Sequence, residues 1–342
     1  MSAPGSARPT SFPLRMPRMP LHDPYVVADA ESGLYHLYTA AQGLGTGVGT
    51  MVYRSENLRD WAEPVPVFLV DDQDEPWARH GAWAPEVHRW KDAWYLFTTL
   101  HDEDAVLEVP PPDRYGLPVP LPGHRRSTVT AVADSLTGPF RMLKPEAPIL
   151  PAELMTLDGT LFVDDEGRPW MVYANEWLQR VDGTVEAFPL TEGLDAVAGA
   201  AVMLFKGSDA AWITRELPAG VPYQLAPYVT DGPQLYRTPS GALVCLWSTY
   251  EKNRASGGRI DGEYVQTYAV AASGALEGPW AQGEPLVRGD SGHGMLFTDF
   301  EGRLMMVLHR PFTNARGKLY EMELSDEGLR VVRQCTELDG DA

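Results

Sequence analysis

The sequence predicts an all-β fold, a five-bladed β-propeller with four-stranded antiparallel blades around a central channel. The first observation is a short phrase that occurs five times along the 342 residues. The second is its spacing: aligned residues are 61, 74, 73 and 62 positions apart, about one propeller blade with a long loop. The third is that each copy opens a β-hairpin, so the repeat is built of strands.

The five copies share a position that we call the slot, the second residue of each phrase. They begin at His22-Asp23-Pro24-Tyr25, Trp83-Ala84-Pro85-Glu86, Leu157-Asp158-Gly159-Thr160, Thr230-Asp231-Gly232-Pro233 and Gly292-His293-Gly294-Met295. The slot therefore holds Asp23, Ala84, Asp158, Asp231 and His293. In a closed ring, residues at one shared position face one another across the centre.

Each hairpin is a pair of β-branched and aromatic runs broken by a polar turn. The pairs are 24–29 with 34–39, 86–90 with 94–98, 160–163 with 169–173, 234–237 with 243–247, and 295–298 with 304–308. A second phrase follows each pair, at 52–61, 129–140, 187–194, 269–280 and 322–329. It supplies a third and a fourth strand, and closing five such blades into a ring removes the exposed sheet edges. We expect one catalytic domain over residues 1–342, with residues 1–19 as an N-terminal arm.

Two stretches interrupt the repeat and lengthen its middle copies. Residues 103–126 and 206–229 are rich in proline and polar residues and are expected to be long loops. Long loops in a compact fold are often functional, so we expect these two to decide how far the site is walled off.

The composition excludes several kinds of partner. The net charge of −19 and the pI near 4.8 argue against nucleic acid and against an anionic membrane surface, because both need basic patches. No apolar stretch approaches the roughly 18 residues of a membrane span. Cys245 and Cys335 form no disulfide framework or zinc spacing, and Cys245 lies in an apolar run typical of a buried thiol. The start of the chain has no signal-peptide pattern, so a cytoplasmic location is expected.

The aspartates of the slot suggest a hydrolytic site. One aspartate before a proline or glycine more often shapes a turn, but Asp23, Asp158 and Asp231 would converge at one mouth of the channel. Clustered carboxylates repel one another, so one can keep a proton while others stay ionised. Glycoside hydrolysis needs this division, because one carboxylic acid protonates the leaving oxygen and one carboxylate activates water.

The ends of the second strands return to the same mouth. Glu176 adds a fourth carboxylate there, with a surface position beside Trp177 as the alternative. Aromatic rings at the mouth could stack on sugar rings or pack in the core. His293, in the fifth slot, could bind a water, an ion or a backbone group. The candidate substrate-binding residues are Trp83, Glu86, Trp177, His293 and Arg310.

From about residue 20 to about 335 the phrases resemble those of glycoside hydrolase family 43, whose fold is a five-bladed β-propeller. The phrase at His22-Asp23-Pro24-Tyr25 resembles the general-base motif, and Trp83-Ala84-Pro85-Glu86-Val87 resembles the second-blade signature. The phrase at Leu157-Asp158-Gly159 resembles the segment whose aspartate orients the acid and tunes its pKa. The phrase at Gly292-His293-Gly294 resembles the fifth-blade segment, which implies that His293 lies near a water or a Ca²⁺ or Na⁺ ion. No required cofactor is implied.

One phrase departs from the family pattern. The family usually carries its general acid in a Glu-Gly-Pro phrase, where this chain has Asp231-Gly232-Pro233. An aspartate side chain reaches less far, so either Asp231 acts in a tighter pocket or another carboxylate has the role. Glu176 is the first substitute, followed by Asp209 or Glu216 on the loop before the fourth blade.

The resemblance implies an inverting, exo-acting glycosidase of the α-L-arabinofuranosidase type, with an oligosaccharide or glycoside as its substrate. Asp23 would be the base, Asp158 the orienting residue, and Asp231 or Glu176 the acid. A β-xylosidase, a galactosidase or a galactofuranosidase of the same fold is the alternative activity. A sugar-binding propeller without catalysis is a second class of function, and a protein-interaction scaffold is a third.

Overall fold

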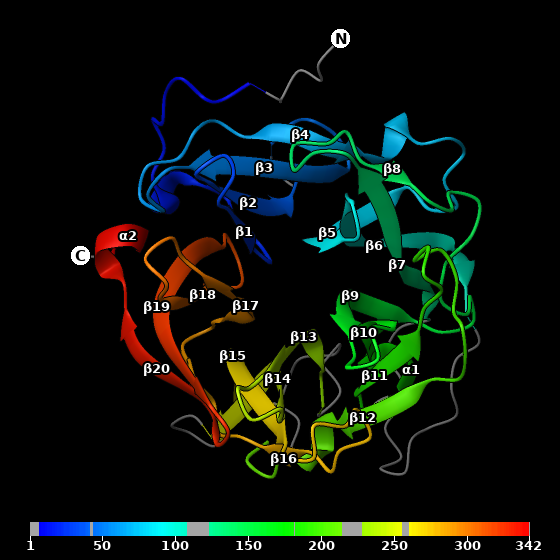
Figure 1. Ribbon diagram of the computed structural model, residues 1–342. Coiled ribbons are helices and arrows are strands. Elements are labelled where there is room, and N and C mark those ends of the chain that lie inside the picture. Colours follow the sequence, from blue (N-terminus) through cyan, green and yellow to red (C-terminus); the bar gives the residue numbers. More distant parts are fainter. Residues whose placement is uncertain are drawn as a thin grey trace.

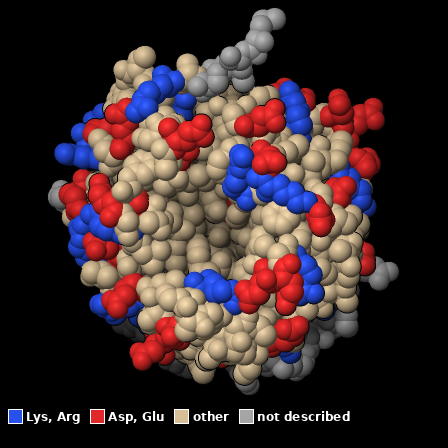
Figure 2. All heavy atoms as spheres, in the orientation of Figure 1, with Lys and Arg blue, Asp and Glu red and all other residues tan. Residues whose placement is uncertain are grey.

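The prediction of a five-bladed propeller is confirmed. The computed structural model describes residues 7–41, 44–107, 123–180, 182–213, 228–254 and 260–341. Within these ranges twenty strands form five antiparallel sheets of four strands each. The sheets follow one another around a central axis, with the first strand of each nearest the centre (Figure 1). Figure 2 shows that the ring is hollowed at its centre on the face turned to the viewer.

The blades are consecutive in the chain, and no blade takes a strand from another. Blade one contains β1 (Tyr25–Asp29), β2 (Leu34–Ala40), β3 (Gly49–Ser55) and β4 (Val65–Leu69). Blade two contains β5 (His80–Trp90), β6 (Ala93–Val106), β7 (His124–Ala133) and β8 (Arg141–Met142). Blade three contains β9 (Thr156–Val163), β10 (Pro169–Asn175), β11 (Thr184–Pro189) and β12 (Val202–Lys206).

The last two blades repeat the same order. Blade four contains β13 (Asp231–Arg237), β14 (Leu243–Arg254), β15 (Ile260–Ala271) and β16 (Ala281–Gln282). Blade five contains β17 (Gly292–Thr298), β18 (Leu304–Arg310), β19 (Arg316–Ser325) and β20 (Gly328–Gln334). The short helices are η1 (Met16–Arg18), η2 (Val70–Asp72), α1 (Trp177–Arg180), η3 (Gly207–Asp209) and α2 (Thr336–Asp339). None of the helices in the described ranges is long and apolar enough to cross a membrane.

The core is divided into five apolar clusters, and each lies between two neighbouring blades. Between blades one and two, for example, Tyr38 of β2 packs in one cluster with Leu96 of β6 and Val129 of β7. Each sheet is thus buried on both faces, and the blades stabilise one another. Cys245 and Cys335 are free and buried, as expected for core thiols.

The segment before β1 closes the ring. Leu14 forms a bridge with Trp61 of blade one, and the backbone N–H of Leu21 donates to the carbonyl of Ala315 beside blade five, at 3.1 Å. Between them, Met16 and Met19 are fully buried in the cluster shared by these two blades. Residues 14–19 therefore pack between the first and last blades. They are the C-terminal end of the expected arm, and this part of the arm belongs to the ring.

Each first strand has, near its start, a residue with a left-handed backbone that we call the kink residue; β5 also has left-handed residues at Gly81 and Ala82. The kink residues are Asp23, Ala84, Asp158, Gly232 and His293, with φ between 45° and 55°. The slot alignment is therefore wrong by one residue in blade four, where Gly232 and not Asp231 is the equivalent of Asp23. Proline follows the kink residue in blades one, two and four, so aligning these prolines also aligns the left-handed residues.

The residue before the kink, which we call the pre-kink residue, is then His22, Trp83, Leu157, Asp231 or Gly292. In blades two to five the register between the first two strands shifts across this pair, as in a β-bulge, and in blade two it also shifts just before Trp83. A bulge bends the strand and turns its side chains to new directions.

The two expected loops are only partly loops. β6 extends to Val106 and β7 starts at His124, so the ends of the 103–126 stretch are strands. In the 206–229 stretch, η3 spans Gly207–Asp209 and Tyr228 bridges to Asp182. Residues 108–122 and 214–227 lie outside the described part of the chain.

Candidate active site

A cavity of about 400 Å³ lies where the kinks meet. The catalytic and aromatic candidates that line it are Asp23, Asp158, Asp231, Glu176, Trp83 and Trp177. The other lining residues are His22, Ala40, Arg126, Leu157, Val229, Thr230, Tyr250 and Phe312. Four of the five pre-kink residues are among them, so these positions supply most of the wall and the kink residues supply two of the carboxylates.

The kinks are held by side chains of the preceding blade. The N–H of Asp158 donates to Thr99 Oγ1 on β6 at 3.0 Å, and the N–H of His293 donates to Ser248 Oγ on β14 at 2.8 Å. In blade one the N–H of Asp23 approaches His309 Nδ1 on β18 at 3.3 Å. Each acceptor comes from the second strand of its blade, so the ring fixes the position of these kinks through the neighbouring sheet.

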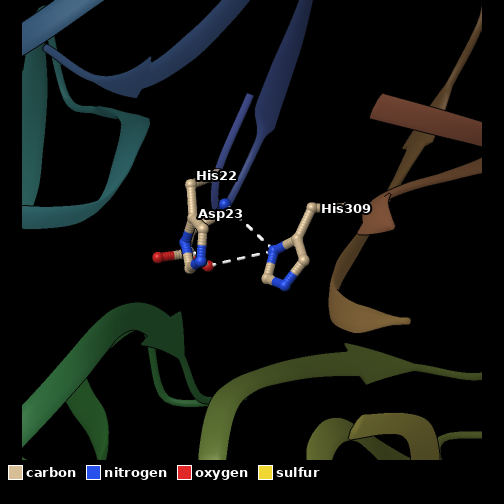
Figure 3. A group of neighbouring side chains, drawn as sticks. All are labelled: His22, Asp23 and His309. Carbon is tan, nitrogen blue, oxygen red and sulfur yellow. Dashed lines mark hydrogen bonds and ion pairs between the residues drawn. The ribbon is translucent and has the colours of Figure 1, made fainter. Parts of the chain in front are cut away.

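Three imidazoles surround one carboxylate oxygen of Asp23. The Nδ1 atoms of His22, His293 and His309 lie 2.9, 3.2 and 3.2 Å from Asp23 Oδ1. Figure 3 shows two of them, with His22 and Asp23 entering from blade one and His309 from blade five. His309 Nδ1 also meets the Asp23 N–H, so its tautomer decides which of the two contacts is the hydrogen bond.

The histidines keep Asp23 ionised. Burial alone would raise its pKa, but the charges of His22 and His293 and the hydrogen bonds of His22 and His309 hold the pKa of Asp23 well below its usual range. The pKa of His22 is raised in turn: burial lowers it, but the charge and hydrogen bond of Asp23, the charge of Asp231 and a backbone hydrogen bond with Phe312 together outweigh burial. Burial lowers the pKa of His309, so this ring is neutral. The result is a carboxylate poised to accept a proton.

Asp158 has the opposite behaviour. Burial, the charge of Asp231 and a hydrogen bond between the two carboxyl groups raise the pKa of Asp158 well above its usual range. Asp158 Oδ2 accepts a hydrogen bond from the N–H of Gly232 at 3.0 Å, and the hydroxyl of Tyr264 donates to Asp231 Oδ2. Two carboxyl groups this close cannot both be ionised at little cost, so the pair retains a proton.

Glu176 is held apart from this pair by an ion pair of its own. Arg126 Nη1 lies 2.5 Å from Glu176 Oε2, and both side chains are buried. Burial raises the pKa of Glu176, and the Arg126 guanidinium opposes that effect. The guanidinium also lies over the Trp83 ring, 4.8 Å from its centroid. Arg126 thus links a carboxylate and an aromatic wall of the cavity.

His293 lies at the centre of the acidic cluster. Its Nδ1 is 3.2 Å from Asp23 Oδ1 and 3.9 Å from both Asp158 Oδ2 and Asp231 Oδ1. Among the described residues two groups have ligand atoms close enough for a metal, namely His22, Asp23 and His309, and Asp158, Asp231 and His293. Calcium and sodium prefer six or more oxygen ligands, whereas these groups mix one or two carboxylates with imidazole nitrogen. The donor set does not fit direct binding of the ion that the resemblance implies.

Two predicted substrate-binding residues lie away from the cavity. Glu86 is buried, where it contacts His88 Nε2 at 2.9 Å and the amide of Gln234. Arg310 pairs with Asp341 at 2.6 Å. Glu86 lies further along β5 than its kink residue, where it pairs with Phe97 of β6, and alternation along β18 turns Arg310 away from the side that His309 occupies.

Of the two further substitutes for the acid, Asp209 does not line the cavity. Asp209 is exposed and accepts a hydrogen bond from the N–H of Lys206 at 2.9 Å at the start of η3. Glu216 lies outside the described residues.

Several lining residues were not predicted. His22 stands directly before a predicted base, and its side chain could have been considered as that base's partner. Tyr250 lies within β14 and Phe312 follows β18, at the mouth that the pattern had located. Arg126 has no sequence signal, because nothing in the pattern distinguishes it from Arg125.

The chain was compared with known proteins. The model for "Glycosyl hydrolases family 43" matches residues 18–325. A solved endo-arabinase from Bacteroides thetaiotaomicron VPI-5482 is 31% identical, with a TM-score of 0.76, covering 92% of this chain and 99% of that one. A comparison with curated protein sequences found no match.

Two other solved structures are similar in fold. An endo-1,4-beta-xylanase from the same Bacteroides strain is 20% identical with a TM-score of 0.67, covering 92% of this chain and 95% of that one. A xylan beta-1,4-xylosidase from Bacillus halodurans C-125 is 19% identical with a TM-score of 0.62, covering 93% of this chain and 56% of that one.

Proposed function

Because this chain belongs to glycosyl hydrolases family 43 and is thus an O-glycosyl hydrolase, we propose that it cleaves α-L-arabinofuranosidic bonds with inversion, removing terminal arabinofuranose from oligosaccharides. The observation that carries this proposal is the division of protons in the cavity. Asp23 is held ionised, whereas Asp158 and Asp231 retain a proton between them. A base and an acid on opposite sides of a sugar are what hydrolysis by inversion requires.

In the proposed reaction Asp23 takes a proton from a water molecule as the water oxygen attacks the anomeric carbon. Asp231 gives its proton to the oxygen of the leaving group as the glycosidic bond breaks. Asp158 acts through Asp231, by holding the shared proton and by fixing the Gly232 N–H beside it. The products are the free sugar and the shortened glycan, and the enzyme regains its protonation by exchange with solvent.

The contacts of His293 set an upper limit on the separation of base and acid. His293 Nδ1 lies 3.2 Å from Asp23 Oδ1 and 3.9 Å from Asp231 Oδ1, so these two oxygens are at most 7.1 Å apart. Inversion calls for roughly 6.5–9.5 Å between the two carboxyl groups.

Asp231 is a better candidate than Glu176 for the acid. Burial raises the pKa of Glu176, but the Arg126 guanidinium occupies its Oε2 at 2.5 Å, so this oxygen cannot present a proton to the leaving group. Asp231 shares a proton with Asp158, and its side chain is 22% exposed toward the cavity, whereas that of Glu176 is 6% exposed. Asp231 is a pre-kink residue and therefore lies in the wall of the cavity. This position offsets part of the reach that its side chain loses by being shorter than that of glutamate.

The choice of sugar and of terminal cleavage is supported less directly. The 31% identical structure carries the name of an arabinase, which favours arabinofuranose over xylose. Aromatic rings of Trp83, Trp177 and Tyr250 bound the cavity, and a space closed in this way suits a terminal sugar. A second candidate is internal cleavage of arabinan, which the "endo" in the same name favours.

The experiment is a hydrolysis screen over nitrophenyl α-L-arabinofuranoside, β-D-xyloside, and galactopyranoside and galactofuranoside substrates. We expect the highest kcat/KM with the arabinofuranoside, the β-anomer as the first product in NMR, and a loss of about 10²–10⁴ in kcat for Asp23→Asn. The control is Asp29→Asn at the end of β1, outside the cavity. Full activity of Asp23→Asn would remove Asp23 as the base, and a wild-type protein that binds these sugars without cleaving any would be a non-catalytic propeller.

A further inference from the structure

The kink of blade four differs from those of blades three and five in what holds it. There, the side chain that accepts the kink N–H is Thr99 or Ser248, and each of these residues pairs with the pre-kink residue of its own blade. In blade three the residue with this pairing is Ala174, whose side chain has no acceptor for the next kink, Gly232. The N–H of Gly232 donates to Asp158 Oδ2 instead, at 3.0 Å. The kink beside the proposed acid is therefore bonded to a catalytic carboxyl group.

The start of β13 also has few bonds to its own sheet. Asp231 and Gln234 pair with β14, whereas Gly232 and Pro233 between them lie outside the register of the ladder. Proline has no N–H with which to bond a neighbouring strand. Gln234 is thus the first residue beyond the kink that the sheet holds, and its position decides where Gly232 and Asp231 lie.

The side chain of Gln234 is held from across the central channel. The residue two positions beyond the kink is Glu86 in blade two, Thr160 in blade three and Gln234 in blade four. Gln234 Nε2 donates to Glu86 Oε1, and Thr160 Oγ1 approaches Gln234 Oε1 at 3.5 Å. Blades two and four are not neighbours in the ring, so the bond between Glu86 and Gln234 spans the channel beyond the kinks (Figure 1).

Burial makes this bond hard to give up. Glu86 is 2% exposed and Gln234 is 6% exposed, so water does not compete for either group. A hydrogen bond is stronger in such surroundings, and a buried donor or acceptor that loses its partner is costly. The amide of Gln234 therefore keeps its place opposite Glu86.

We propose that Glu86 is a positioning residue for the acid: through Gln234 it holds the start of β13, and with it Asp231, from across the channel. The inference rests on the proposed function, because it takes Asp231 as the acid. Glu86 does not line the cavity, so it acts on the reaction through Gln234. It supplies the hold on the scaffold that the kink of blade four does not receive from Ala174.

The first test compares two leaving groups in Gln234→Met, which removes the amide and keeps much of the side-chain volume. We expect kcat on α-1,5-arabinotriose to fall roughly 10- to 100-fold from misplacement of the acid, and kcat on a dinitrophenyl α-L-arabinofuranoside to fall less than about threefold, because a good leaving group needs no acid. Equal losses on the two substrates, or no loss on either, would overturn the inference.

The matched control is Gln73→Met. Gln73 is also buried, and its amide donates to the backbone carbonyls of Leu69 and Phe140 outside the cavity. This variant loses buried hydrogen bonds as Gln234→Met does, so it reports the effect of lower stability alone. It should change the two rates by the same factor.

Variants of Glu86 test the same bond from its other end. Glu86→Gln keeps an oxygen that can accept from Gln234 and should retain kcat on arabinotriose within about threefold, whereas Glu86→Met should lose roughly 10- to 100-fold. A loss in Glu86→Gln as large as in Glu86→Met would refute the bond as the cause. Should Gln234→Met fail to fold, Gln234→Asn, whose amide is one methylene short of Glu86, takes its place with the same expectation.

Hydrogen exchange separates the two proposals because it needs no substrate. The amides around Gly232 should exchange about tenfold faster in Gln234→Met and in Glu86→Met than in the wild type, and at the wild-type rate in Gln73→Met. If the wild-type enzyme hydrolyses none of the substrates, the proposed function fails, and the exchange rates alone then decide whether Glu86 holds this kink. Unchanged exchange in both variants would refute that hold.

Discussion

At the scale of single residues, the site depends on three aspartates whose neighbouring groups differ. Asp23 meets three imidazole nitrogens, whereas Asp158 meets a second carboxyl group and one backbone N–H. The same side chain therefore serves as base in one place and as proton holder in another, because its neighbours differ in charge.

The pH profile of kcat/KM should report both groups. Asp23 must be ionised, and its pKa is depressed, so activity should persist as the pH falls below the usual aspartate range near 3.9. The proton of the Asp158 and Asp231 pair must be present, and the pKa of Asp158 is raised, so activity should be lost as the pH rises through that raised value. A profile measured with the nitrophenyl substrate checks both limbs.

Removal of His22 should move only one limb. In His22→Asn the Asp23 carboxylate loses its largest favourable charge interaction, so its pKa rises and the acid limb shifts to higher pH. His88→Asn, whose ring contacts Glu86 outside the cavity, is the matched control. An acid limb that stays in place in His22→Asn would show that His22 does not set the protonation of Asp23.

The identity of the acid can be read from the leaving group. We expect Asp231→Asn to lose about 10²–10⁴ in kcat on oligosaccharides but much less on a dinitrophenyl arabinofuranoside, because a good leaving group needs no protonation. Glu176→Gln should show no such difference between substrates. Rates of both variants on the two substrates check the assignment, and a leaving-group dependence in Glu176→Gln alone would transfer the role to Glu176.

At the scale of elements, the left-handed kink at the start of each first strand positions the site. The residue before the kink lines the cavity in blades one to four. In blade five this residue is Gly292, which has a different structural role. A Cβ atom there would lie 2.2 Å from Tyr264 Cε1. Gly292 therefore makes room for the ring whose hydroxyl donates to Asp231.

Gly292→Ala should accordingly displace Tyr264. We expect a loss of stability of about 1–3 kcal/mol from overpacking and a fall in kcat of up to about 10²-fold from misplacement of Asp231. Tyr264→Phe should reproduce part of the loss in kcat without the overpacking, and Gly193→Ala on the surface of blade three should do neither. Urea denaturation and steady-state rates check both effects; an unchanged rate in Gly292→Ala would mean that Tyr264 has no part in positioning Asp231.

The elements also show what the sequence could predict. Strand pairs and their order followed from short apolar runs and turns, which are local patterns. The alignment failed by one residue in blade four because it compared residue types, whereas the backbone conformation defines the equivalent position. Aligning the prolines at 24, 85 and 233 would have placed Gly232 beside Asp23. Arg126 could not be found in this way, since its ion pair with Glu176 joins two blades and leaves no local trace.

At the scale of the whole molecule, the ring is closed by side chains. No strand is exchanged between blades one and five, and the buried residues Met16 and Met19 fill the joint between them. The stability of the ring should therefore depend on this short segment more than its length suggests.

Met16→Ala and Met19→Ala should each lower the free energy of unfolding by about 2–5 kcal/mol, the usual cost of truncating a buried methionine. Met203→Ala is the control, because that side chain is 50% exposed on β12. Chemical denaturation of the three variants checks the expectation. Variants of Met16 and Met19 as stable as Met203→Ala would show that the ring holds without this segment.

The pre-kink positions have a consequence for engineering. The backbone kink and its anchors on the preceding blade stay the same while the side chain before the kink differs from blade to blade, as His22, Trp83 and Leu157 show. A combinatorial library at Trp83 and Leu157 would reshape the lining while leaving the base with its His22 partner, the acid and the scaffold untouched. Selectivity for new glycans could then be evolved separately from the catalytic chemistry.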